Sequence, residues 1–115
     1  MVTRIKSGSR MSQAVVPGNT VYLAGQVASD TSADTAGQTR QILATIDSLL
    51  AEAGTDKRHV LAATVYLTDM STFNEMNAAW EAWIAPGCAP TRATVGAPLA
   101  SSAYRVEIVI TAARD

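Results

Sequence analysis

The sequence predicts an α+β fold, in which a mixed sheet of β-α-β-α-β-β order carries two helices on one face. Apolar residues alternate with other residues along 60–68 and 104–113, which is the period of a strand. They recur every three or four residues along 42–53 and 73–84, which is the period of a helix. These segments follow one another without a linker, so residues 1–115 are expected to form a single domain.

One or two short strands should precede this unit. Residues 2–6 predict a weak edge strand. Residues 14–16 and 20–25 predict two strands, because the tight turn Pro17-Gly18-Asn19 separates two β-prone runs. The small, polar residues from Gln26 to Thr35 predict a loop that leads into the first helix.

The two helices have clear ends and clear apolar faces. The first should end at Gly54, a residue type favoured just after a helix. The second should be capped by Asp69 or Ser71 and stopped by Pro86-Gly87. The expected buried residues are Ile42, Ile46, Leu49, Leu50 and Ala53 in the first helix, and Phe73, Met76, Trp80, Trp83 and Ile84 in the second. Both tryptophans are therefore interpreted as core residues.

The strand alternation assigns residues to two faces of the sheet. Right-handed crossovers place both helices on the same face. The residues expected beneath them are Leu61, Val65, Leu67, Ala93, Val95, Val106, Ile108 and Ile110. The residues expected on the opposite face are Thr64, Tyr66, Arg92, Thr94, Glu107, Val109 and Thr111. Nothing in the chain would cover that semi-polar face, so we expect it both to pack on another subunit and to hold a ligand.

Arg92 is the first candidate for a ligand-binding residue. It lies in the run APTRATVG among small residues, and Glu107 follows fifteen positions later in YRVEIVIT. The planar guanidinium of arginine matches the two oxygens of a carboxylate or phosphate. The residue pattern leaves a second interpretation open, in which Arg92 pairs with an acid or ends a strand at the surface.

Composition argues against several classes of protein. Nine basic residues, scattered along the chain, stand against ten acidic ones, so no basic patch for nucleic acid is expected. The N-terminus has no apolar signal region and no run is long enough to span a membrane. Cys88 and His59 are the only residues of their types, which disfavours a disulfide, a metal site or a nucleophilic triad. We therefore expect a cytoplasmic protein.

Four segments resemble the RidA (YjgF) family, which is also labelled endoribonuclease L-PSP-like or reactive-intermediate deaminase. They are VYLAGQV at 21–27, LLAEAG at 49–54, TVYLTDMSTFNEMNAAWEAW at 64–83, and APTRATV followed by RVEI at 105–108. The pattern D-x-x-x-F-x-x-M-N at 69–77 is the most specific part of the resemblance.

The resemblance implies a chorismate-mutase-like fold that assembles as a homotrimer. In that fold the last strand inserts into the middle of the sheet, and the sites lie in clefts between subunits. The activity implied is hydrolysis of reactive 2-enamine or 2-imine acids to a 2-keto acid and ammonia. No metal or organic cofactor is implied.

Site residues are implied position by position. Arg92 matches the arginine that binds the substrate carboxylate, and Glu107 matches the acid that holds or activates water. Gly25 matches a glycine whose backbone positions the substrate. Thr94 stands where many members have cysteine, and its backbone would serve equally.

Two positions depart from the family pattern. Met11 stands where an aromatic residue, often tyrosine, is common, and Ala24 stands where serine is frequent. Both changes indicate an altered pocket. Beside an imine deaminase, two alternatives remain open: a non-catalytic binder of small carboxylates, and an endoribonuclease or translation inhibitor, which the lack of a basic patch disfavours.

Overall fold

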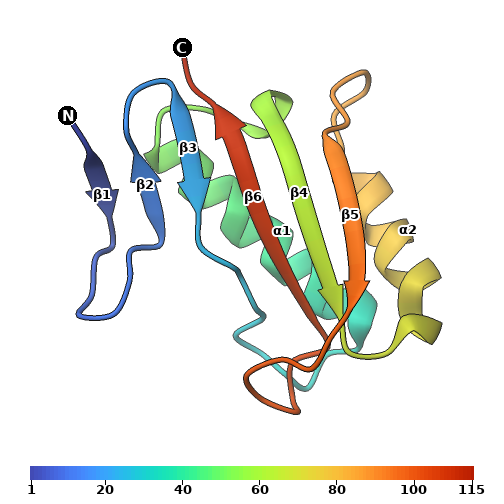
Figure 1. Ribbon diagram of the computed structural model, residues 1–115. Coiled ribbons are helices and arrows are strands. Elements are labelled where there is room, and N and C mark those ends of the chain that lie inside the picture. The colour runs from blue at the N-terminus through green and yellow to red at the C-terminus, as the bar shows by residue number, and fades with distance from the viewer.

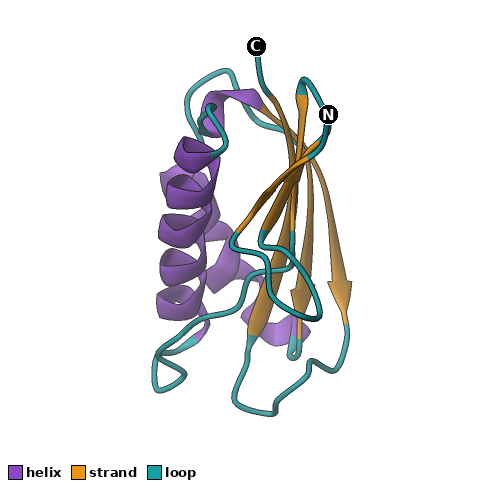
Figure 2. Cartoon of the chain, turned by 90° about the vertical axis from the view of Figure 1, so that its left-hand side faces the viewer, coloured by secondary structure: helices purple, strands orange, loops and turns teal.

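A computed structural model describes residues 1–115 as a six-stranded mixed sheet with two helices. The two helices lie together on one face of the sheet, and the other face is uncovered (Figures 1 and 2). The strands are β1 (Thr3–Ile5), β2 (Ala14–Val16), β3 (Thr20–Leu23), β4 (Val60–Leu67), β5 (Thr91–Gly96) and β6 (Val106–Ala113). The helices are α1 (Thr35–Glu52) and α2 (Phe73–Trp83). The predicted α+β order, with two short strands before it, is confirmed.

The strand order across the sheet is β1-β2-β3-β6-β4-β5. The last strand, β6, lies between β3 and β4 and is antiparallel to both. β4 and β5 run parallel, joined by the crossover through α2. The insertion of the last strand into the middle of the sheet, which the family resemblance implied, is confirmed, and β5 becomes an edge strand.

Local chemistry explains the ends of the helices. Asp34 caps α1, because its carboxylate accepts a hydrogen bond of 2.8 Å from the backbone N–H of Gly37. Gly54 follows α1 with a φ of +86°, a conformation that glycine adopts without steric cost. Asp69 caps a 3-10 turn, Met70–Thr72, that leads directly into α2, so the predicted start of the second helix is close to the observed one.

The hydrophobic core lies between the helices and the sheet. Every residue expected on the buried face of the first helix is buried. In α2, Met76, Trp80 and Trp83 are buried, and Phe73 and Ile84 pack against the core while partly exposed. The interpretation of both tryptophans as core residues is confirmed.

The expectation that Leu61 faces the helices is wrong. The pairing of β4 with β6 shifts between Val60 and Ala62, and such an irregularity reverses the alternation of side chains. Val60 is therefore buried, whereas 51% of Leu61 is exposed. From Ala63 onward the alternation follows the prediction.

The two faces of β5 were predicted the wrong way round. Residues that pair across adjacent strands point to the same side of a sheet. Arg92 pairs with Ala63 and Thr94 pairs with Val65, and both of these β4 residues are buried beneath the helices. Arg92 and Thr94 therefore lie on the helix side, and the apolar Val95 is 41% exposed on the open face.

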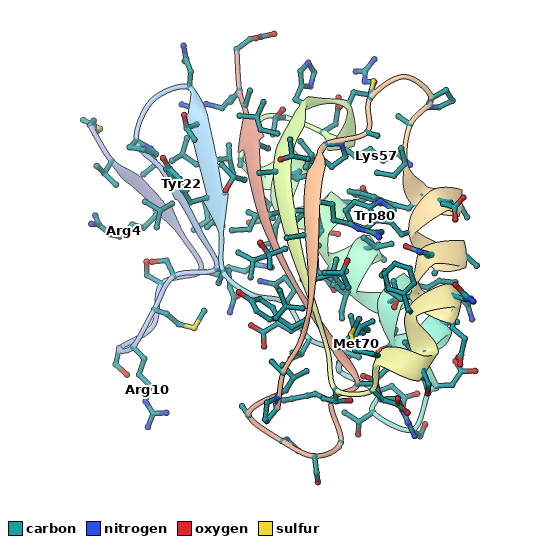
Figure 3. The ribbon with its side chains drawn as sticks, turned by 45° about the vertical axis from the view of Figure 1, so that its right-hand side comes forward. Arg4, Arg10, Tyr22, Lys57, Met70 and Trp80 are labelled. Carbon is teal, nitrogen blue, oxygen red and sulfur yellow. The ribbon has the colours of Figure 1, made fainter.

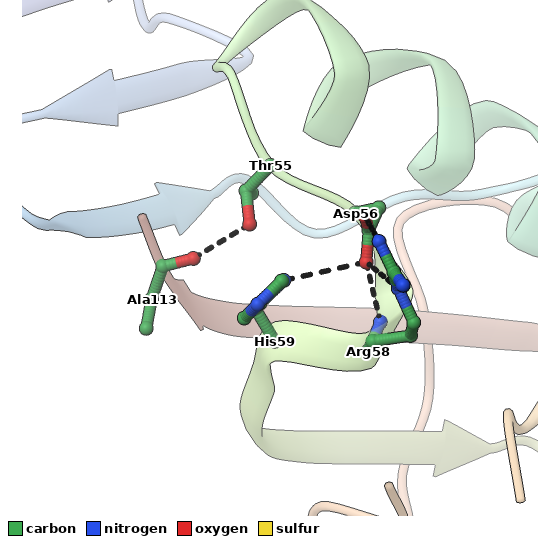
Figure 4. A network of polar contacts seen from close by, with 5 residues as sticks. All are labelled: Thr55, Asp56, Arg58, His59 and Ala113. Carbon is green, nitrogen blue, oxygen red and sulfur yellow. Dashed lines mark hydrogen bonds and ion pairs between the residues drawn. The ribbon is translucent and has the colours of Figure 1, made fainter. Parts of the chain in front are cut away.

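A polar network precedes β4 (Figure 4). The Thr55 hydroxyl donates a hydrogen bond of 2.7 Å to the carbonyl oxygen of Ala113. The Asp56 carboxylate accepts hydrogen bonds from the backbone N–H and the guanidinium of Arg58, and lies 3.3 Å from Nδ1 of His59. His59 is thus a partly exposed residue at the junction before a strand. No helix of the chain is long and apolar enough to cross a membrane.

Candidate functional site

Glu107 projects from the open face of the sheet. It lies between Val106 and Ile108, both fully buried on the helix side, so strand alternation directs the carboxylate away from the core. Tyr66 is its partner across the pairing of β4 with β6, and shares the same face. None of the three ion pairs in the chain includes Glu107, so its carboxylate is free to meet a ligand or water.

Gly25 lies directly against this carboxylate. A Cβ at position 25 would overlap the carboxylate oxygen of Glu107. The approach is set by a bridge that follows β3. The N–H of Gln26 donates to the carbonyl of Ile108 at 2.9 Å, and the carbonyl of Gln26 accepts from the N–H of Ile108 at 3.1 Å. A larger residue at position 25 would displace the Glu107 carboxylate, because its Cβ and that side chain would occupy the same space. The structure therefore brings together two residues that the resemblance assigned to one site.

Gln26 connects this segment to the N-terminal loop. Its side chain is buried and donates to the carbonyl of Ala24 at 3.0 Å and to Oε1 of Gln13 at 2.8 Å. The N–H of Ala24 donates in turn to the carbonyl of Gln13 at 2.9 Å. Met11 lies on the same loop, but 49% of it is exposed and it lines no pocket within the chain.

A pocket of about 250 Å³ opens beside Glu107 on the open face. Its lining residues are Tyr66, Ala97, Pro98, Leu99, Ala100 and Glu107. Two polar side chains therefore stand opposite a small apolar wall, an arrangement that suits a small molecule with one polar end. No three His, Cys, Asp or Glu side chains come close enough together to hold a metal ion.

Arg92 packs on the other side of the sheet, against α2. Its guanidinium carbon lies 5.9 Å from the ring centre of Phe73 and 5.4 Å from that of Trp80. Nη1 lies 3.8 Å from the sulfur of Met76. Burial lowers the pKa of Arg92, against an opposing effect of Glu81. The side chains of Trp80 and of the residues around it fill the layer between β5 and α2 (Figure 3).

No carboxylate lies within ion-pair distance of Arg92. The alternative interpretation, in which Arg92 pairs with an acid or ends a strand at the surface, therefore does not hold, because Arg92 lies inside β5 and is half-buried. Thr94 lies on the same side of β5. The predicted site residues thus fall into two groups, with Gly25 and Glu107 on the open face and Arg92 and Thr94 on the helix side.

Sequence reasoning did not assign Tyr66, Pro98 or Leu99 to the site. Tyr66 was expected on the open face, but only the register of β4 against β6 places it beside Glu107. The wall at 97–100 has no periodic pattern, and no feature of the sequence indicates its position. Phe73 and Trp80 have the helical spacing of core residues, so the sequence predicts a core role and does not indicate their contact with Arg92.

Comparisons with known proteins show the family to which the chain belongs. The family model described as Endoribonuclease L-PSP matches residues 1–114. A RutC family protein of Haemophilus ducreyi is 49% identical over 113 residues, covering 98% of this chain and 97% of that protein. The RutC family protein YoaB of Escherichia coli is 43% identical over 112 residues, with 97% of each chain covered.

Solved structures give the same result. A member of the YjgF protein family from Neisseria meningitidis superimposes with a TM-score of 0.97 at 43% identity, covering 100% of this chain and 96% of that chain. The mixed sheet with two helices on one face is the fold of that family. The chain belongs to the Endoribonuclease L-PSP family, to which the resemblance to RidA and YjgF proteins pointed.

Proposed function

We propose that the protein hydrolyses reactive 2-enamine or 2-imine acids to 2-keto acids and ammonia. The observation that carries this proposal is the unpaired Glu107 carboxylate, which lies against Gly25 at the wall of a small pocket. A second unpaired charge, the Arg92 guanidinium, has nearly all of its hydrogen-bond donors unused. A carboxylate base and a carboxylate-binding cation are the two groups that such a substrate needs.

The chemistry requires little else of the protein. An imine carbon is already electrophilic, so binding the substrate carboxylate and holding a water molecule beside the carbon can supply most of the rate. Glu107 would accept a proton as the water oxygen bonds to the imine carbon. That proton moves to nitrogen, which gives a carbinolamine. Glu107 then takes the hydroxyl proton of the carbinolamine and passes it to nitrogen, so the carbon–nitrogen bond breaks, the carbonyl of the keto acid forms and ammonia leaves. Glu107 returns to its starting form.

A complete site requires more than one copy of the chain. Arg92 and Glu107 of one chain lie on opposite faces of the sheet, so one small substrate cannot touch both. The open face also exposes Tyr22, with 51% of its surface accessible, and Val95. We propose that copies of this chain cover that face in a homotrimer. In this assembly Arg92 and Thr94 of one protomer face Gly25, Ala24 and Glu107 of its neighbour, and Met11 forms part of the wall.

The test measures keto-acid release from freshly generated 2-iminopropanoate, with and without the protein. We expect a rate above that of spontaneous hydrolysis, proportional to protein concentration and lost in Arg92→Ala and Glu107→Gln. The control is Arg40→Ala, an exposed residue of α1 on the helix side of the sheet, away from the open face. Binding of a keto acid without acceleration would favour the non-catalytic carboxylate binder instead. A stable folded monomer would contradict the inter-subunit site.

A further inference from the structure

The guanidinium of Arg92 lies between two aromatic rings of one helix. Phe73 and Trp80 are seven residues apart on α2, which corresponds to about 10 Å along the helix axis. Arg92 reaches across from β5 into this interval, with its guanidinium carbon 5.9 Å from one ring centre and 5.4 Å from the other. Met76 lies between the two rings in sequence and contacts Nη1 through its sulfur.

Aromatic rings stabilise this cation in an unusual way for a half-buried group. The negative face of a ring attracts a guanidinium within about 6 Å, without accepting its N–H groups in conventional hydrogen bonds. A carboxylate partner would occupy two of those donors in the fork that recognises planar anions. The chain supplies no such carboxylate to Arg92, and the only acceptor in reach is a weak one, a thioether sulfur.

We infer that Phe73 and Trp80 are positioning residues for Arg92: their rings orient its guanidinium and leave its N–H edge free for a substrate carboxylate. This inference rests on the proposed function, because it assigns Arg92 the carboxylate of the substrate. It gives two residues of α2 a role in substrate binding, in addition to their packing in the core. Partial desolvation between the rings strengthens the attraction between the guanidinium and an incoming anion.

Trp83 provides the control for a purely structural role, because its ring packs on the ring of Trp80, with ring centres 5.5 Å apart, but not on Arg92. It lies on the same helix, is 8% exposed against 6% for Trp80, and belongs to the same core cluster. Trp83 donates to Oδ1 of Asp47 at 3.0 Å and packs under Lys57 rather than Arg92. Replacing either tryptophan with leucine removes a similar aromatic volume, but only one replacement removes a ring from Arg92.

The experiment measures the dissociation constant of 2-oxobutanoate, a carboxylate of the product class, by isothermal titration calorimetry. We expect at least a five-fold weaker constant in Phe73→Leu and Trp80→Leu, and a constant within two-fold of wild type in Phe73→Tyr and Trp83→Leu. The amide 2-oxobutanamide, which lacks the charge, should bind all variants alike. Phe73 is partly exposed, so its variants keep the test valid if Trp80→Leu does not fold.

A second measurement reports on the free protein. The Nε–Hε NMR signal of Arg92, assigned by its absence in Arg92→Lys, should be shifted upfield by the rings and should lose that shift in Trp80→Leu. If wild type binds 2-oxobutanoate and neither Phe73→Leu nor Trp80→Leu binds it more weakly, the positioning role alone is overturned. Absence of binding by wild type would overturn the proposed function together with this inference. Equal losses in Trp80→Leu and Trp83→Leu would reduce both tryptophans to core residues.

Discussion

Arg92 and Glu107 project from opposite faces of one sheet, with β4 between their strands. Arg92 pairs with Ala63, which pairs in turn with Ile110 on β6. Glu107 is three residues from Ile110, so the two charges are also offset by about 10 Å along the strand direction. A guanidinium and a carboxylate arranged in this way cannot neutralise each other within one chain. Both charges therefore remain available to a ligand, and the proposed site between two copies would use one charge from each copy.

Subunit complementation provides the sharpest test of this arrangement. Mixed trimers of two inactive variants, Arg92→Ala and Glu107→Gln, should recover activity, because some interfaces combine an intact Arg92 with an intact Glu107 from the neighbour. Random mixing of equal amounts should restore about a quarter of wild-type activity, since each mixed trimer regains one of its three sites. The measurement is keto-acid release after co-refolding. Mixing without recovery would place both residues of a site on one chain.

Arg92→Lys should be nearly as inactive as Arg92→Ala. Lysine keeps the charge but not the planar fork that orients a carboxylate, and it makes a less favourable contact with the two rings. We expect KM to rise by about ten-fold or more, with an unchanged melting temperature. Steady-state kinetics and a thermal melt measure both quantities. Near-normal activity in Arg92→Lys would mean that only the positive charge matters.

Glu107→Gln should lower kcat much more than it raises KM. The amide can still hydrogen-bond to a water molecule but cannot accept its proton, so a fall of about 10²-fold in kcat is expected. Single-turnover measurements would locate the loss in the chemical step. A mutant with the kcat of wild type would limit Glu107 to a structural role on the open face.

Gly25→Ala should inactivate the protein while preserving its fold. The new methyl group would occupy the space of the Glu107 carboxylate, and the displaced carboxylate would no longer meet the water. A displacement of about 1 Å can cost about 10²-fold in rate. Gly8→Ala is the control, because a Cβ there would have its nearest neighbour, the carbonyl oxygen of Met11, at 3.7 Å. Comparable activity in both variants would contradict the assigned position of Glu107.

Asp56 should contribute to the acid dependence of stability. Hydrogen bonds from the side chain and backbone of Arg58 hold the pKa of Asp56 well below its ordinary value of 3.8, and the nearby His59 acts in the same direction. A depressed pKa stabilises the folded state above the unfolded value, and this contribution is lost as the pH falls below it. The melting temperature of Asp56→Asn should therefore fall less than that of wild type between pH 5 and pH 2, on the order of a degree, because Asp56 is exposed. Parallel curves would contradict this role.

The sequence predicts much of the fold because its signals are local. The helical spacing of Ile42 and Ile46, the stop at Gly54, and the cap at Asp69 depend on residues a few positions apart. The same holds for the core role of Trp80, since an apolar stripe on a helix must find a partner surface. The family resemblance added the strand order, which no local pattern contains.

Tertiary structure alone decided the face of the sheet on which each charged side chain lies. The alternation of residues along 91–96 is compatible with Arg92 on either face of the sheet. Only the pairing of Arg92 with Ala63 on β4 places it on the helix side. The contact of Gly25 with Glu107 joins residues 82 positions apart through one bridge at Gln26. Strand register and bulges are set by long-range pairing rather than by neighbours in the chain. The sequence by itself thus determined the elements and the chemistry of the candidate residues, whereas the paired sheet determined that Arg92 and Glu107 face apart.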